Sequence, residues 1–211
     1  MADNPLAYWR LDEASGTNAA DSSGNGRNGA YANGVTLGSA GALVGDSDTG
    51  ATFDGSDDNV TVPDDPTMRL NGSWSIEFWA QQISYMHTYP GILGKGANPT
   101  QPTGYGIWSD SNGALWFMRD NQVSGSGNGA LTTAFRYFVL TYDAATQKMR
   151  WYVNGALATT TTLSFSTNSG TQPFQLGQGA GLYGNNGFDE VALYGAALSA
   201  ARIAAHYTAG T

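Results

Sequence analysis

Residues 74–82 read WSIEFWAQQ, and their side chains change in character with a period of two. Trp74, Ile76, Phe78 and Ala80 fall on one face of an extended chain, because successive side chains of a β-strand point to opposite sides. Strict alternation of this kind indicates a strand rather than a helix. The stretch therefore predicts a strand with one apolar face, packed in a sheet against a core.

Similar short runs follow one another along the chain and are separated by Gly, Asn or Asp. This pattern predicts an all-β, antiparallel, two-sheet jelly-roll sandwich. Asn112-Gly113 is a strong hairpin signal, residues 38–50 are expected to form a surface loop, and Ser199 is expected to cap a short C-terminal helix that stops at Gly210. Because no linker interrupts the series, we expect residues 1–211 to form one domain. The expected strands lie in residues 5–11, 51–55, 59–63, 74–82, 105–120, 135–143, 148–155, 174–179 and 187–195.

The composition excludes several classes of function. Only 12% of residues are charged and the net charge is −8, with no run of Lys or Arg, so we expect no nucleic-acid partner. The chain has no Cys, which excludes disulfides and thiolate metal sites. No signal peptide and no apolar span for membrane insertion are evident. Abundant hydroxyl and amide side chains favour neutral polar partners such as sugars.

Five motifs in order resemble the laminin-G-like, concanavalin-A-like jelly-roll family. The resemblance implies two antiparallel sheets, one of them concave, in a fold that usually serves to bind carbohydrate or protein. It also implies a calcium ion between the N-terminal loop and the last strand. The motifs are LAYWRLDEASGTNAADSSGNGRNGAY (6–31), ATFDGSDDNVTVP (51–63), WSIEFWAQ (74–81), FVLTYD with MRWYVNG (138–143 and 149–155) and FDEVALYGAALSAARIAAHYTAG (188–210).

Residues 19–34, AADSSGNGRNGAYANG, carry the oxygen-bearing side chains that a hard cation prefers. Asp21, Ser23 and Asn25 alternate as in the first half of an EF-hand loop, but Ala32 stands where that loop needs its bidentate acid. A distant carboxylate must then help, and the resemblance points to Asp189. The expected cofactor is calcium, and the candidate ligands are Asp21, Asn25, Gly29 and Asp189.

One alternative to a cation site in residues 19–34 stays open. Asp21 can instead cap a turn, with Asn25-Gly26 forming a tight loop. The acidic group Asp54, Asp57 and Asp58 is expected to belong to a hairpin turn rather than to a metal site.

An enzymatic role is not expected. The chain has only three Glu, and none belongs to the Glu-x-Asp-x-Glu strand of glucan-cleaving relatives. Asp189 and Glu190 are adjacent, so a regular strand would send them to opposite faces. His87 has no nucleophile motif beside it.

A sugar site needs aromatic rings for the apolar face of the sugar and planar polar groups for its hydroxyls. Trp9, Trp74 and Trp151 are expected in the core, where most tryptophans of a sandwich lie. Trp108 and Trp116 can lie either in the core or on the concave surface. The aromatic and polar candidates for a glycan site are Tyr85, His87, Tyr89, Trp108, Trp116, Arg119, Asn121 and Tyr183.

The sequence thus predicts a calcium-stabilised, non-catalytic, lectin-like module that binds a glycan or glycoconjugate. The rival prediction is a structural or interaction protein, such as a phage virion decoration or tail component or an adhesin module, with virion or surface proteins as partners. Without a signal peptide, the expected location is a virion or, for an excised domain, an extracellular surface. The sequence leaves the oligomeric state open.

Overall fold

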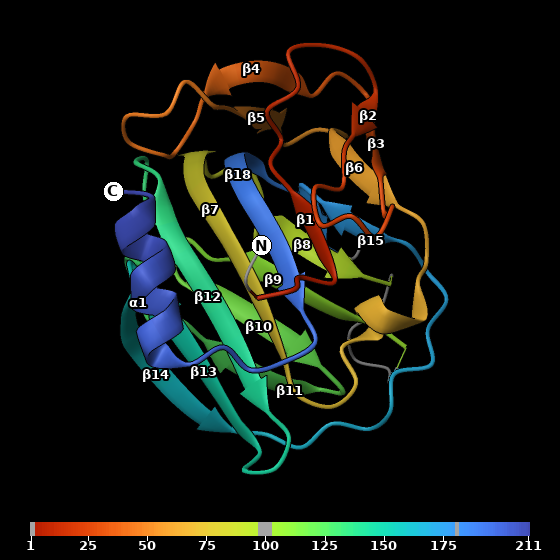
Figure 1. Ribbon diagram of the computed structural model, residues 1–211, viewed down its shortest axis with the longest axis vertical. Helices are drawn as coiled ribbons and strands as arrows, with labels where there is room; N and C mark the ends of the chain where they lie inside the picture. The colour runs from red at the N-terminus through yellow and green to blue at the C-terminus, as the bar shows by residue number, and fades with distance from the viewer. Residues whose placement is uncertain (1–2, 97–102, 180–181) are drawn as a thin grey trace.

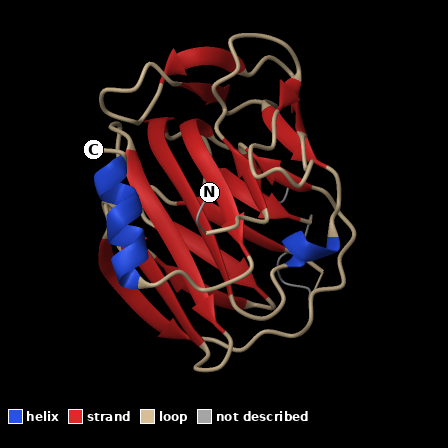
Figure 2. Cartoon of the chain, in the orientation of Figure 1, coloured by secondary structure: helices blue, strands red, loops and turns tan. Residues whose placement is uncertain are grey.

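The computed structural model describes residues 3–96, 103–179 and 182–211, and it shows two antiparallel sheets packed face to face (Figure 1). Helix α1 (Ala200–Ala209) lies at the C-terminal end, and a short 3₁₀ turn, η1 (Pro66–Arg69), lies earlier in the chain, as Figure 2 shows. The predicted all-β antiparallel sandwich with a C-terminal helix is confirmed. Among the described residues, no helix is long and apolar enough to cross a membrane.

Within the described residues, the first sheet has eight strands. Seven follow one path, and β1 (Ala7–Trp9) pairs with β18 beside that path. In spatial order the path is β14 (Ala156–Thr162), β13 (Lys148–Val153), β12 (Arg136–Asp143), β7 (Trp74–Ser84), β18 (Asn185–Tyr194), β5 (Thr49–Asp54) and β4 (Thr36–Ala40).

The second sheet also has eight strands within the described residues. A separate two-stranded sheet is formed by β16 (Gln178–Gly179) and β17 (Leu182–Tyr183). In spatial order the eight strands are β11 (Gln122–Gly125), β10 (Leu115–Arg119), β9 (Tyr105–Ser109), β8 (Gly91–Lys95), β15 (Phe174–Leu176), β6 (Asn59–Val62), β3 (Gly29–Ala32) and β2 (Asn18–Ala19).

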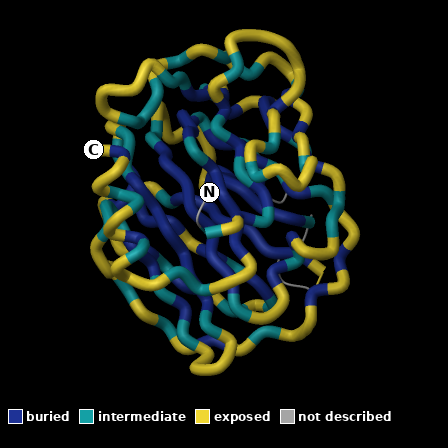
Figure 3. The backbone as a smooth tube through the Cα atoms, in the orientation of Figure 1, coloured by how far each residue is buried: buried dark blue, intermediate teal, exposed yellow. Residues whose placement is uncertain are grey.

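The main core lies between the two sheets, where the buried strands run in Figure 3. Trp9 stacks on Phe174 at 5.3 Å between ring centroids, and Trp74 lies 5.3 Å from Phe117. Trp151 is fully buried in the same cluster. The three tryptophans expected in the core are therefore there, and each joins strands of both sheets.

A second apolar cluster covers the outer face of the first sheet. Helix α1 places Ile203 and Tyr207 against Trp79 and Tyr137, and the Ser199 side chain accepts a hydrogen bond from the Arg202 N–H, as the cap was expected to do. Both faces of β7 are consequently buried over most of its length. Alternation alone predicted one apolar face, because it could not show that α1 returns to cover the other.

Two local expectations need correction. Residues 38–50, expected as a surface loop, include most of β4, an edge strand that pairs with β5. The acidic turn of Asp54, Asp57 and Asp58 closes no hairpin: it carries the chain from β5 in the first sheet to β6 in the second. The Asp58 carboxylate accepts a hydrogen bond from the Asp54 N–H and the Asp54 carboxylate accepts one from the Ser56 N–H, so these two side chains serve as turn caps.

His206 joins α1 to the first sheet and to the N-terminal segment. Its Nδ1 lies 3.0 Å from Glu77 of β7 and its Nε2 lies 3.1 Å from Asp3, which Arg202 of α1 also contacts. The hydrogen bond with Glu77 raises the pKa of His206 most, partial burial opposes that rise, and Asp3 adds to it.

We expect this contact to make the docking of α1 pH-dependent. A raised histidine pKa means that the stabilising charge is complete below the unfolded pKa and is lost as the pH rises through the folded pKa. Replacing His206 by Gln should therefore lower the free energy of unfolding more at about pH 6 than at about pH 9. Urea unfolding of the wild type and the variant at the two pH values measures this loss. An equal loss in the free energy of unfolding at both pH values would contradict the prediction.

Candidate functional site

A pocket opens on the outer face of the second sheet, away from the core. In β10, Leu115 and Phe117 point into the core, so the alternate residues Trp116 and Met118 point outward. The pocket measures about 490 Å³. We call it the aromatic pocket, and its lining residues are Tyr89, Trp108, Asp110, Trp116, Met118, Val123 and Leu182.

Glycines on the sheet make room for the two indole rings. Trp116 pairs directly with Trp108 across β9 and β10, and with Gly125 across β10 and β11. A Cβ atom added to Gly125 would lie 2.8 Å from Cζ3 of Trp116, and one added to Gly106 would lie 2.6 Å from Cη2 of Trp108. Each indole thus covers a glycine, and Trp116 remains 37% exposed while Trp108 is 8% exposed.

Asp110 fixes the other edge of Trp116. Its Oδ1 accepts hydrogen bonds from the N–H groups of Asn112 and Ala114, and its Oδ2 accepts one of 2.8 Å from the indole Nε1 of Trp116. Burial alone would raise the pKa of Asp110, but these hydrogen bonds lower it below its usual value. The carboxylate is therefore ionised at neutral pH. Asp110 is not among the site residues predicted from the sequence, although its position ahead of Asn112-Gly113 marks a turn cap.

A single methyl group should test how the ring is held. We expect Gly125→Ala to displace Trp116. This should weaken the affinity of the pocket for its ligand about tenfold, a loss of ~1.4 kcal/mol in the free energy of binding. Gly195→Ala is a matched control, because its Cβ would meet Leu6 at an ordinary 3.5 Å. Titration calorimetry of both variants measures the effect, and equal affinities would show that the ring position does not matter.

The predicted ligand residues of loop 85–89 divide between two places. Tyr89 lines the aromatic pocket, and its N–H donates to the Tyr85 hydroxyl at 3.3 Å. His87 instead contacts the Gly55 carbonyl at 3.0 Å, in the turn between β5 and β6. In β17 the pocket residue is Leu182 rather than the predicted Tyr183. Only Tyr89, Trp108 and Trp116 of the predicted set therefore share this pocket.

Arg119 and Asn121 do not join them. Arg119 follows Met118, so its side chain points inward, where it is 2% exposed and donates to the Leu70 carbonyl at 2.9 Å. It also donates to the Ser166 carbonyl and lies 5.1 Å from the centre of the Phe165 ring. Asn121 adopts a left-handed backbone conformation between β10 and β11. The prediction that placed Arg119 with the sugar-facing aromatics is corrected: it ties two loops together.

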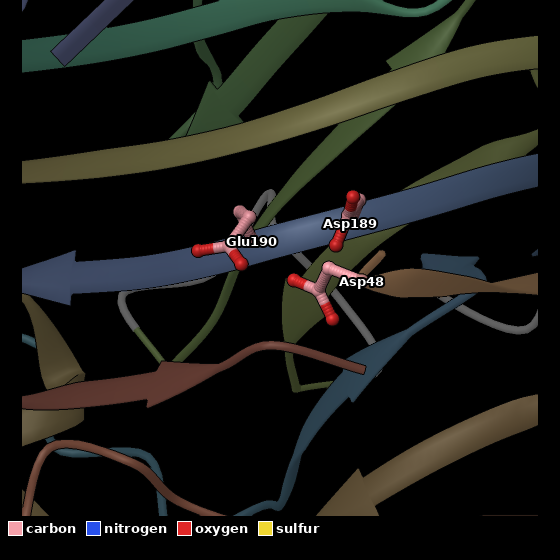
Figure 4. A group of neighbouring side chains, drawn as sticks. All are labelled: Asp48, Asp189 and Glu190. Atoms are coloured by element: carbon pink, nitrogen blue, oxygen red, sulfur yellow. The ribbon is translucent and has the colours of Figure 1, made fainter. Parts of the chain in front are cut away.

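A second site is a group of carboxylates at β18. Asp48, Asp189 and Glu190 have oxygens within 4.8 Å of one another, and we call them the carboxylate cluster (Figure 4). Glu190 has a left-handed φ of 53°, and a bulge shifts the pairing of β18 with β7 between Asp189 and Ala192. Because of this bulge, both neighbouring acids reach one cluster, contrary to the expectation that they face opposite sides.

The charges of the carboxylate cluster are only partly balanced. Arg10 contacts Asp48 at 2.5 Å, Glu190 at 3.2 Å and Asp12 at 3.3 Å, so one guanidinium faces several acids. Asp189 accepts a hydrogen bond from the Ala42 N–H through Oδ2, but its buried Oδ1 has no partner among the described residues. Burial raises the pKa of Asp189 to about 7 and that of Glu190 to about 7. Excess negative charge and an unpartnered buried oxygen fit a divalent cation.

The predicted N-terminal ligands are not in this cluster. Asp21 accepts hydrogen bonds from the N–H groups of Tyr8, Ser23 and Arg27, which is the turn-capping role left open by the sequence. Trp9 forms a bridge with Asp21 on one side and pairs with Val191 on the other, so β1 separates Asp21 from β18 by ~10 Å.

Asn25 and Gly29 also have structural roles. The Asn25 amide donates to the carbonyls of Pro5 and Leu6, which holds the N-terminal segment in place. Gly29 is buried in β3, where a Cβ would lie 2.5 Å from Cγ1 of Val60. Of the four predicted ligands, only Asp189 belongs to the carboxylate cluster, and Asp48 is not among the ligands predicted from the sequence.

Solved structures share this architecture at low sequence identity. The receptor-binding domain of the botulinum neurotoxin C/D mosaic serotype matches with a TM-score of 0.74 at 11% identity, over 99% of this chain and 52% of that chain. The binding domain of botulinum neurotoxin DC, in complex with rat synaptotagmin II, matches with a TM-score of 0.73 at 17% identity, over 99% and 52%. A Trypanosoma rangeli sialidase in complex with sialic acid matches with a TM-score of 0.71 at 16% identity, over 97% and 32%.

The chain spans about half of the neurotoxin domains and about a third of the sialidase, so these likenesses concern the fold alone. None of the curated proteins matches the chain significantly. The family model of the concanavalin A-like lectin/glucanases superfamily, of the laminin G type, matches residues 54–204, which is well over half of the sequence. The chain therefore belongs to the concanavalin A-like lectin/glucanases superfamily.

Proposed function

We propose that this chain is a non-catalytic binding module that holds a glycan against Trp116 in the aromatic pocket. The exposed and fixed indole of Trp116 is the observation that carries this proposal. One ring edge covers Gly125 and the indole N–H is bound to Asp110, so the ring is held in place before a ligand arrives. An exposed aromatic ring stacks on the apolar face of a sugar at little entropic cost.

The size of the aromatic pocket supports a small ligand or one unit of a longer chain. Its volume of about 490 Å³ lies within the range of ~300–1,000 Å³ that is usual for ligand pockets. The superfamily and the solved structures of the same fold support a module that binds carbohydrate or protein. Our choice of a glycan over a protein as the ligand rests on the aromatic lining of the pocket.

The lining of the pocket argues against glycoside hydrolysis there. That reaction uses two carboxyl groups about 5–10 Å apart, on either side of the bond that is cleaved. Asp110 is the one acidic residue among the described residues that line the pocket, and its oxygens already accept three N–H groups. Binding without chemical change is the role that this lining favours.

A protein partner is the second candidate. Leu182, Val123 and Tyr89 are exposed apolar side chains at the pocket, and such a patch suits a protein interface. One neurotoxin domain of the same fold carries bound synaptotagmin II. A virion decoration protein or an adhesin module would use this surface for assembly.

We further propose that calcium stabilises the module at the carboxylate cluster. Asp48, Asp189 and Glu190 would hold the ion through carboxylate oxygens, the ligand type that calcium prefers. The ion would supply positive charge where a single guanidinium now faces several acids. Its role is structural, because it would join the segment before β5 to the last strand.

A glycan array with added calcium, compared with the same array in chelator, tests the proposed function. We expect retention of a group of related glycans, and loss of that retention in Trp116→Ala. Size-exclusion chromatography with light scattering tests the second candidate, for which self-assembly is the expected result. If no glycan is retained by the folded protein, the glycan proposal is rejected.

A further inference from the structure

The aromatic pocket offers few polar groups to a neutral sugar. Both indole N–H groups are already used: Trp108 donates to the Gly179 carbonyl at 3.0 Å and Trp116 donates to Asp110. The other polar side-chain groups of its described lining are the Tyr89 hydroxyl and the Asp110 carboxylate, beside apolar Met118, Val123 and Leu182. A neutral sugar ring with several hydroxyls would find too few partners here.

The same lining carries one uncompensated negative charge. Neither Lys nor Arg is among the described residues that line the pocket, and Asp110 takes part in no ion pair within the described part of the chain. A carboxylate has about four lone-pair sites, and Asp110 uses three, so Oδ2 keeps one for a further donor. A partly buried charge beside apolar groups favours a cationic partner.

The indole of Trp116 strengthens this preference. Its N–H donates to an anion, and hydrogen bonds of this kind polarise the donor group, which makes the ring face more negative. A cation within about 6 Å of an indole face is attracted by ~0.5–2 kcal/mol. The net charge of −8 adds a weak attraction at longer range.

We infer that the aromatic pocket selects glycans that carry free amino groups, such as glucosamine oligomers, over their N-acetylated or neutral counterparts. An amino sugar meets both features at once, since its apolar face covers Trp116 while its ammonium group donates to Asp110. This inference rests on the proposed glycan-binding function and names its ligand class.

The test compares glucosamine oligomers with N-acetylglucosamine and glucose oligomers of equal length by titration calorimetry. Mildly acidic buffer keeps the amines protonated, while Asp110 stays ionised because its hydrogen bonds lower its pKa. We expect glucosamine oligomers to bind at least about tenfold more tightly. Asp110→Asn should remove this preference, and higher salt should weaken it.

A second variant keeps the test decisive if Asp110→Asn disturbs the turn. Val123 is 38% exposed and lines the pocket, so Val123→Asp adds a carboxylate without loss of core packing. It should tighten binding of glucosamine oligomers and not of glucose oligomers.

Three outcomes would overturn the inference. Equal or tighter binding of the neutral or acetylated oligomers rejects it and leaves the proposed glycan-binding function standing. Equally tight binding of oligolysine rejects it, because charge alone would then suffice. Failure to bind any glycan rejects both the inference and the function on which it rests.

Discussion

Removing calcium with a chelator is expected to lower the Tm of this protein by about 5–10 °C. A ligand at about one hundred times its Kd adds ~2.7 kcal/mol to the free energy of unfolding. For a chain of this length, each kcal/mol corresponds to about 2–4 °C. The effect is large because the carboxylate cluster buries acidic groups and Arg10 is the one cation that contacts them among the described residues. Differential scanning calorimetry with calcium and with chelator measures it.

Asp189→Asn is the variant that identifies the site. Asparagine keeps the size of the side chain and the oxygen that accepts the Ala42 N–H, but it removes the buried charge. The variant should show one Tm in both buffers, and that Tm should be no lower than that of the calcium-free wild type. Without calcium, burial raises the pKa of Asp189 to about 7, so this group lowers the free energy of unfolding as the pH rises from its unfolded pKa of about 4 to about 7, and the full loss persists above pH 7.

Asp21→Asn is the matched control for the sequence-based ligand set. Its carboxylate accepts three N–H groups, so the variant should lose stability equally with calcium and with chelator, and should keep the calcium-dependent shift. An unchanged wild-type melting curve in chelator would contradict the calcium proposal. If the calcium-dependent change in Tm is lost in Asp21→Asn but kept in Asp189→Asn, the calcium site lies in the N-terminal loop instead.

Trp116→Ala is expected to weaken glycan binding about thirtyfold, a loss of ~2 kcal/mol. The ring is 37% exposed and lies outside the core, so the Tm should change little. Titration calorimetry with a glycan retained on the array measures the loss.

Leu157→Ala is the control for this loss. Leu157 is 55% exposed in β14 and pairs with Tyr152, whose side chain packs in the cluster beneath α1, so both lie on the outer face of the other sheet. This variant should bind as the wild type does. Equal affinity for wild type and Trp116→Ala would exclude the aromatic pocket as the glycan site.

The sequence by itself determined the fold class and much of the core. Alternation in residues 74–82 placed Trp74, Ile76 and Phe78 correctly, because a period of two reports which side of a strand each residue occupies. Asn112-Gly113 marked the hairpin of β9 and β10, and Ser199 marked the start of α1, since turns and caps depend on neighbouring residues alone.

Only the tertiary structure decided which distant groups share a site. Asp48 and Asp189 are 141 positions apart and meet because β5 pairs with β18, and a bulge at Glu190 reverses the side that simple alternation assigned to it. Parity places Arg119 and Trp116 on opposite faces of β10, but only the tertiary structure shows that Arg119 ties two loops together at the core and that Trp116 faces a pocket. Strand pairing joins segments that are far apart in the sequence. Local sequence patterns therefore predict where the strands lie, but not which strands pair and which side chains come together in one site.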